Sequence, residues 1–111
     1  MTAQELATGL EATGYPVVYR QWKQAQNPPY IVYLFVESAD LMADNENYLP
    51  AGDYHVELYT DDKDPTAEAS VENELRALGL PWSKLETWIE AEAMNQVLYT
   101  VRIIETREVV S

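Results

Sequence analysis

The chain has 111 residues, of which 47% are hydrophobic, and this predicts one globular domain with a substantial core rather than a disordered chain. Because it contains no cysteine, disulfides, thiolate nucleophiles, zinc–thiolate sites and iron–sulfur clusters are excluded. Its net charge of −12, with seven scattered basic residues against 19 acidic ones, argues against a protein that binds nucleic acid through phosphates.

The first predicted element is a short amphipathic helix near the N-terminus. The segment Thr2–Glu5 matches the capping box, and Leu6 and Leu10 follow at helical spacing. Gly14 and Pro16 end this helix. No basic leader or long apolar run is present, so we expect no signal peptide, no membrane span and a protein made in the cytoplasm.

Three strands are predicted to follow this helix. Residues Pro16–Trp22 alternate as a strand does, and Asn27–Pro29 forms a turn. Tyr30–Val36 is apolar on both faces, which predicts a central strand covered on both sides. After the long segment 39–52, Asp53–Thr60 alternates strictly, which predicts one buried face and one face that is wet or at an interface.

A second helix and two more strands are predicted to complete the chain. Asp64 suits the N-cap and Pro65 the first helical position, and the helix ends at Gly79. Strands then run over residues 84–90 and 96–104, where apolar side chains alternate.

The resulting order, α-β-β-β-α-β-β, predicts the fold class. We expect an α+β two-layer domain over residues 1–111, with a mainly antiparallel β-sheet and two helices on one face. Residues 39–52 form an extended loop in this prediction, and residues 105–111 form a loose tail.

The loop 39–52 is the first candidate contact element. It is longer than the two to five residues of a usual hairpin loop, and it is too apolar to be a solvated spacer. We expect a docking arm, mobile in the free subunit and ordered on a neighbour, whose contacts are Leu41, Met42, Tyr48 and Leu49. The predicted second contact element is the hairpin Glu90–Asn95, which contributes Glu90, Glu92 and Met94.

Side chains capable of catalysis or metal binding are sparse. His55, the only histidine, stands beside Glu57 on the polar face of a strand, as a surface or interface histidine does. The acids within Asp61–Asp64 resemble part of a calcium loop, but Thr66 occupies the position that requires glycine, so helix capping is preferred. We therefore expect no catalytic residue, no metal and no cofactor.

Aromatic side chains exceed what two thin layers need. About half of them suffice for core packing, and tyrosine and tryptophan are enriched at protein–protein interfaces. The remainder therefore indicate a partner, most economically a second copy of the chain. The residues in question are Trp22, Trp82, Trp88, Tyr33, Tyr59 and Tyr99.

Three stretches together resemble a family of phage and prophage morphogenesis proteins. They are ATGYPVVYRQWKQAQNPPYIVYLF, LMADNENYLPAGDYHVELYT and KLETWIEAEAMNQVLYTVRII. By size and architecture, the chain resembles the tail-completion, or tail-terminator, proteins of long-tailed phages. The resemblance covers about Glu5 to Ile104 and implies a head–tail joining role without an active site.

The resemblance also implies partners and a location. The subunit would form a ring, typically a hexamer, that contacts the major tail protein and a head-completion or connector protein. It would lie in the virion at the head–tail junction, after assembly in the host cytoplasm and away from membranes. DNA would pass through the ring without specific binding, and an acidic lumen would repel its phosphates.

Two other functions remain open from the residues alone. An acidic inhibitor or regulatory protein that binds a basic partner would also carry this charge. An enzyme that uses His55 and nearby carboxylates is the third alternative.

Overall fold

The computed structural model describes residues 1–43 and 47–105 of the chain, and the side chains of residues 41–48 lie outside that description. The elements, in chain order, are α1 (Ala3–Glu11), β1 (Val17–Tyr19), β2 (Tyr30–Ser38), β3 (Leu41–Ala43), β4 (Asn47–Leu49), β5 (Ala51–Thr60), α2 (Pro65–Ala77), β6 (Trp82–Ile89), the 3-10 turn η1 (Glu90–Glu92) and β7 (Met94–Ile104).

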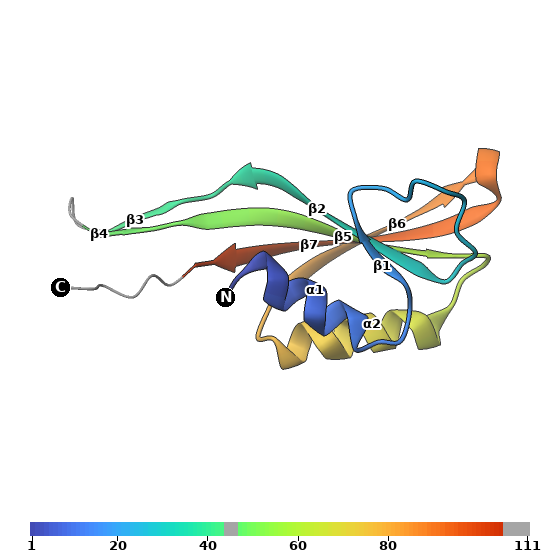
Figure 1. Ribbon diagram of the computed structural model, residues 1–111, viewed down its shortest axis with the longest axis horizontal. Helices are drawn as coiled ribbons and strands as arrows, with labels where there is room; N and C mark the ends of the chain where they lie inside the picture. Colours follow the sequence, from blue (N-terminus) through green and yellow to red (C-terminus); the bar gives the residue numbers. More distant parts are fainter. Residues whose placement is uncertain (44–46, 106–111) are drawn as a thin grey trace.

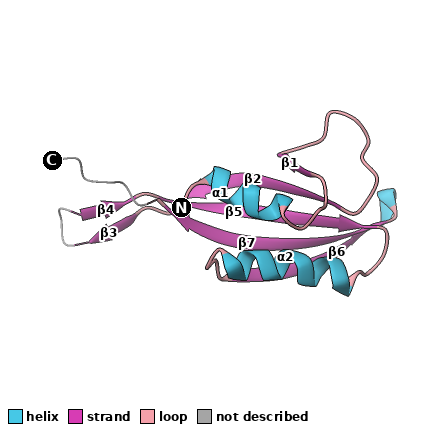
Figure 2. Cartoon of the chain, turned by 60° about the horizontal axis from the view of Figure 1, so that its bottom comes forward, coloured by secondary structure: helices cyan, strands magenta, loops and turns pink. Residues whose placement is uncertain are grey.

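Two layers make up the body of the protein. Five strands form one sheet in the order β1-β2-β5-β7-β6, and α1 and α2 both lie on one face of it (Figures 1 and 2). All pairs in this sheet are antiparallel except β1 with β2. This confirms the α+β class, the mainly antiparallel sheet and the predicted order of its helices and strands.

Local signals in the sequence place both helices. The Thr2 hydroxyl accepts a hydrogen bond from the Glu5 amide at 3.2 Å, and the Asp64 carboxylate accepts one from the Ala67 amide at 3.0 Å. Each cap satisfies a backbone donor that the first turn leaves unpaired. None of the helices in the described part of the chain is long and apolar enough to cross a membrane.

The core lies between the helices and the face of the sheet that they cover. Alternate residues of β5 and β7 point into it, as the period of a strand requires. The largest of its fully buried side chains are Tyr99, Leu6, Leu10, Ile31, Leu58 and Leu75. Of the six aromatic residues considered as partner contacts, Tyr99 belongs to this core, and Tyr33 and Trp82 pack against it.

The first strand is shorter than its prediction, and it makes the one parallel pair of the sheet. The prediction was Pro16–Trp22, whereas β1 covers only Val17–Tyr19. The strand ends there because Arg20 adopts a left-handed backbone conformation with φ of 70°. Residues 20–29 then carry the chain back, so that β1 pairs parallel to β2 rather than through a tight antiparallel turn. Trp22 therefore lies in a connecting loop and not in the sheet.

The segment 39–52 also differs from the extended loop that the sequence predicts. It contains β3 and β4, which form a separate two-stranded antiparallel sheet, and Ala51 and Gly52 already belong to β5. The last two strands start earlier than expected, at Trp82 and Met94. Residues 106–111 of the predicted tail lie outside the described residues.

A charged network fixes α2 against β6. Glu68 is almost fully buried. Its carboxylate oxygens form ion pairs with the ammonium nitrogens of Lys63, at 2.8 Å, and Lys84, at 2.7 Å. Lys84 also pairs with Glu72, whose carboxylate accepts a 2.8 Å hydrogen bond from the Tyr99 hydroxyl. A buried carboxylate with two cationic partners is satisfied rather than stranded, so this network positions β6 at the edge of the sheet.

Removing the Tyr99 hydroxyl is expected to weaken the fold. The Tyr99→Phe variant loses a hydrogen bond to a carboxylate but keeps its ring in the core, so urea unfolding should show a loss of about 1.5 kcal/mol. Tyr54→Phe is the matched control, because the Tyr54 hydroxyl makes no hydrogen bond within the described part of the chain. Equal losses in the two variants would contradict the assigned role of the bond.

Candidate assembly surface

An arm projects from one end of the sheet. It consists of β3 and β4 and continues outward from β2 and β5, and it gives the protein its elongated outline of 52 × 27 × 24 Å (Figure 1). The predicted main contact residues lie on it: in the register, Leu41 is opposite Leu49 and Met42 is opposite Tyr48. Leu49, whose side chain is described, is 41% exposed.

Hydrogen bonds join the base of the arm to the body. The Ala39 amide donates to the Ala51 carbonyl at 2.8 Å, and the Ala51 amide donates to the Asp40 carboxylate at 3.0 Å. On the other side, the Glu105 amide donates to the Pro50 carbonyl at 2.9 Å. The arm is therefore a separate two-stranded sheet whose base is hydrogen-bonded to the body.

Exposed apolar side chains gather around this base. Tyr19, Phe35, Val36, Leu49 and Ile104 are each at least 38% exposed, although large apolar side chains are usually buried. Of these five, Phe35 lines a hollow of about 260 Å³ together with Tyr54 and Ile103, and the acids Asp40 and Glu105 lie beside it. Exposed large apolar side chains at the base of a projecting arm are candidates for burial against a partner.

Gly52 lets two aromatic rings close over the backbone at this point. A Cβ atom at Gly52 would lie 3.0 Å from the Phe35 ring and 3.2 Å from the Tyr54 ring. These rings meet edge to face with centroids 5.6 Å apart. The absence of a side chain at Gly52 therefore shapes the apolar surface at the base of the arm.

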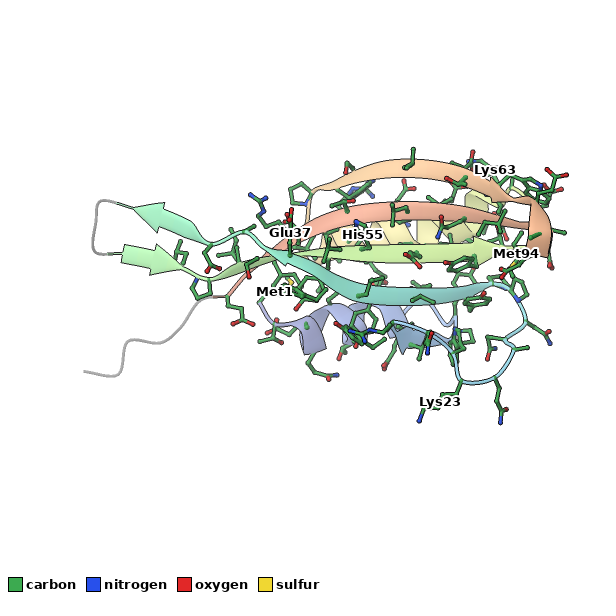
Figure 3. The ribbon with its side chains drawn as sticks, turned by 90° about the horizontal axis from the view of Figure 1, so that it is seen from above. Met1, Lys23, Glu37, His55, Lys63 and Met94 are labelled. Atoms are coloured by element: carbon green, nitrogen blue, oxygen red, sulfur yellow. The ribbon has the colours of Figure 1, made fainter. Side chains whose placement is uncertain are left out.

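The second predicted contact element lies at the opposite end of the sheet. Glu90 and Glu92 are exposed in the 3-10 turn between β6 and β7, and Met94 is half-buried at the start of β7 (Figure 3). Ala93 makes the turn with a positive φ of 49°. The structure thus confirms a hairpin here but does not bring it together with the arm.

An aromatic hollow that no sequence pattern predicts lies near that turn. Residues 20–26 cross the face of the sheet that the helices leave uncovered and enclose a space of about 370 Å³ with Tyr30, Tyr59 and Glu92. The Tyr30 and Tyr59 rings stack at 4.9 Å, and Trp22 meets Tyr30 edge to face at 6.1 Å. Burial raises the pKa of the Tyr30 hydroxyl, and the nearby Glu92 and Glu57 carboxylates raise it further.

Two charged side chains cross the uncovered face near the arm. The guanidinium of Arg102 on β7 donates to both carboxylate oxygens of Asp53 on β5, at 2.8 and 3.2 Å. This hydrogen bonding holds the pKa of the Asp53 carboxyl below its usual value of 3.8. The pair connects two central strands where they lead into the arm.

The Asp53 pair should give stability a specific dependence on pH. A carboxyl with a depressed folded pKa stabilises the fold above its unfolded pKa, and this contribution is lost as pH falls through the folded pKa. At pH 6 the melting temperature of wild type should therefore be slightly higher than that of Asp53→Asn. The two melting temperatures should converge as the pH falls below 3.8, the usual pKa of this carboxyl. A difference that stays constant down to acid would exclude the ionised carboxylate as its cause.

His55 lies on the uncovered face between Leu34 of β2 and Thr100 of β7, with Glu57 on the next row of the same face. This is the polar face that the sequence predicts for it (Figure 3). The hydrogen bonds within the described residues include none that would orient its imidazole as a base. No group of three or more potential ligands within the described residues could hold a metal ion.

The acids after β5 act on the neighbouring backbone. Asp64 caps α2, and the Asp62 carboxylate accepts a hydrogen bond from the Lys63 amide at 2.8 Å. These contacts confirm the helix-capping interpretation of Asp61–Asp64.

Comparison with known proteins gives a fold relationship. No protein-family model matches the chain, and no curated protein sequence matches it. A chain from the virion of a native gene transfer agent particle shares its structure with a TM-score of 0.57 and 16% identity, over 92% of this chain and 90% of that chain. A second solved protein, which carries no functional name, gives a TM-score of 0.59 and 17% identity, over 94% of this chain and 90% of that chain. At such low identity, these likenesses show a common fold.

Proposed function

We propose that this chain is a structural subunit of a phage-like particle, a tail-completion or tail-terminator protein that caps the tail tube and joins it to the head connector. The observation that carries the proposal is the fold shared with a chain of a gene transfer agent virion over 92% of this chain and 90% of that one. Coverage that is nearly complete in both directions means that the whole domain, and not a common substructure, is alike.

The surface supports an assembly role. An arm extends from the body, and exposed apolar side chains surround its base, where a neighbouring protein could bury them. We propose that Leu41, Met42, Tyr48 and Leu49 are the main contacts and that Glu90, Glu92 and Met94 form the second contact at the other end. The partners are further copies in a ring, typically a hexamer, together with the major tail protein and the head-completion protein.

The charge of the chain is consistent with a conduit for DNA. With 19 acidic against seven basic residues, a ring of such subunits repels phosphates, so that DNA passes without specific binding. The Glu57 carboxylate lies on the uncovered face of the sheet and would contribute to an acidic lumen there. An assembled ring with a basic or neutral lumen would contradict this part of the proposal.

Interrupting the gene in a strain that produces the particles tests the role. We expect electron microscopy to show heads and tails that are not joined, or tails of abnormal length, and we expect the intact gene to restore complete particles. Joined particles of normal length would overturn the proposal. Restoration with His55→Ala should match wild type, because the role is assembly; loss of particles with a folded His55→Ala protein would favour the enzyme alternative.

A further inference from the structure

Strand β6 is an outer strand that is open to pairing. Its eight residues, Trp82–Ile89, pair with β7 in an uninterrupted register, and no strand lies on its other side within the described residues. Natural edge strands are usually short, bulged, interrupted by proline or charged. Here Pro81 lies outside the strand, and the two charged residues of the strand already have ion-pair partners. Lys84 pairs with Glu68 and Glu72, and Glu86 pairs with Lys63.

The hydrogen-bond pattern shows which backbone groups of β6 are free. The Glu105 amide donates to the Pro50 carbonyl, next to the paired residues Ala51 and Ile104. Because hydrogen-bonded pairs alternate along an antiparallel ladder, the odd-numbered residues of β7 form their backbone hydrogen bonds with β5. The even-numbered residues of β7 therefore bond toward β6, where their partners are its odd-numbered residues. It follows that the amides and carbonyls of Lys84, Glu86 and Trp88 point outward.

Apolar side chains flank these outward backbone groups. Leu85 is 60% exposed and Trp88 is 49% exposed, the two highest values among the exposed large apolar side chains of the described residues. An added strand would bury both and would satisfy the free amides at the same time. The free backbone groups and the exposed apolar side chains therefore both favour a β-strand as the binding partner of this edge.

The opposite edge of the sheet is protected. β1 has only three residues, and where β2 extends beyond it the Tyr19 hydroxyl accepts a 3.2 Å hydrogen bond from the Phe35 amide. The register also shifts between Phe35 and Glu37, a bulge that discourages pairing. Of the two lateral edges, β6 is the receptive one.

We propose that the β6 edge receives the arm of a second copy of this chain, as an added strand. The inference rests on the proposed ring and names the surface that each arm meets. The arm is a two-stranded sheet whose outer edges are unpaired within the described residues, and such hairpins are marginal without a partner. Because the donor and the acceptor are different surfaces of one chain, the contact is heterologous, and its repetition builds a closed ring if the rotation closes.

Residue-resolved amide exchange tests the pairing directly. On association, exchange at Lys84, Glu86 and Trp88 should slow at least about tenfold, because these amides gain partners. The amides of Leu85 and Thr87 should be slow in both states, because they already bond to β7. Unchanged exchange at the three outward amides in an associated sample would overturn the proposal.

Two complementary variants identify the donor. In the first, Asn-Gly replaces residues 41–49 and shortens the arm; in the second, Glu86→Pro removes an outward amide, which an edge strand tolerates. Each alone should remain monomeric by light scattering, and a mixture should form 1:1 dimers, because one chain keeps its edge and the other keeps its arm. Glu86→Ala is the matched control, since it also loses the ion pair with Lys63 but keeps the amide, and it should associate as wild type does.

The other outcomes contradict the proposal. If the short-arm variant still associates, then β6 pairs with β6 or with another surface. If the mixture stays monomeric while wild type associates, the arm does not meet this edge. If wild type stays monomeric up to its solubility limit, the self-pairing is overturned; the head–tail role is tested separately by particle assembly and could survive that result.

Discussion

Truncating Leu58 to alanine is expected to destabilise the fold by about 3 kcal/mol, measured as the free energy of unfolding in urea. Leu58 is fully buried on the helix-covered face of β5, opposite Ile31 on one side and Val97 on the other. Both strands hold it in place, so the cavity left by the missing atoms cannot collapse without moving the centre of the sheet. The loss is a large share of the roughly 5–15 kcal/mol that stabilises a domain of this size.

The matched control is Leu85→Ala in strand β6. Leu85 stands on the uncovered face and is 60% exposed, so its truncation should cost less than about 0.5 kcal/mol at a concentration where the chain is monomeric. The comparison tests whether one face of the sheet carries the core. Equal losses at Leu58 and Leu85 would mean that the uncovered face is packed as well.

What the sequence predicted correctly depends on contacts between near neighbours. The cap at Thr2 is three residues from Glu5, and the cap at Asp64 is three residues from Ala67, so the residue types alone indicate the helix starts. The alternation along β5 likewise determines which side chains share a face. These local patterns were enough for the fold class and for the order of helices and sheet strands.

The features that the sequence did not predict depend on contacts between residues far apart in the chain. The strand order β1-β2-β5-β7-β6 brings β5 between β2 and β7, and no local pattern encodes such a pairing. β1 ends at Arg20, which adopts a left-handed conformation rare for its residue type, and the connection over residues 20–29 then allows β1 to pair parallel to β2. The prediction of a mainly antiparallel sheet is confirmed, but it did not identify the one parallel pair, β1 with β2.

The candidate site was predicted in part for the same reason. The apolar residues at 41, 42, 48 and 49 marked the arm, but acids and asparagines between them hid its strands, so the segment was predicted to be a loop. The aromatic hollow joins Trp22, Tyr59 and Glu92, which are far apart in the sequence. No sequence pattern signalled it, because Trp22 was predicted to belong to a strand and only the structure places it in a loop.

Shortening the arm is expected to abolish assembly and leave the folded body intact. The variant replaces residues 41–49 with Asn-Gly and keeps the bond between the Ala39 amide and the Ala51 carbonyl that closes the base. The buried core residues among the described side chains all lie in the body that this variant keeps, so the free energy of unfolding should change by less than about 1 kcal/mol. Particle yield should fall to the level of the interrupted gene.

The size of the expected loss follows from the residues removed. Interfaces depend on a few apolar and aromatic anchors, and losing two or more of them weakens association at least about 100-fold. Leu49→Asp tests one anchor alone, because its side chain is exposed and the substitution leaves the backbone of the arm unchanged. Ala69→Glu, on the exposed side of α2, is the control and should yield particles as wild type does.

Comparing the two arm variants distinguishes the effect of the length of the arm from the effect of its apolar side chains. If Leu49→Asp reduces yield and the short arm abolishes it, the arm acts through apolar contacts with a neighbour, as proposed. If only the short arm fails, the arm sets a spacing and its apolar residues are not anchors. Normal yields from both would show that the arm is not a contact element, and the exposed apolar side chains at its base, Phe35, Val36 and Ile104, would then be the surface to test.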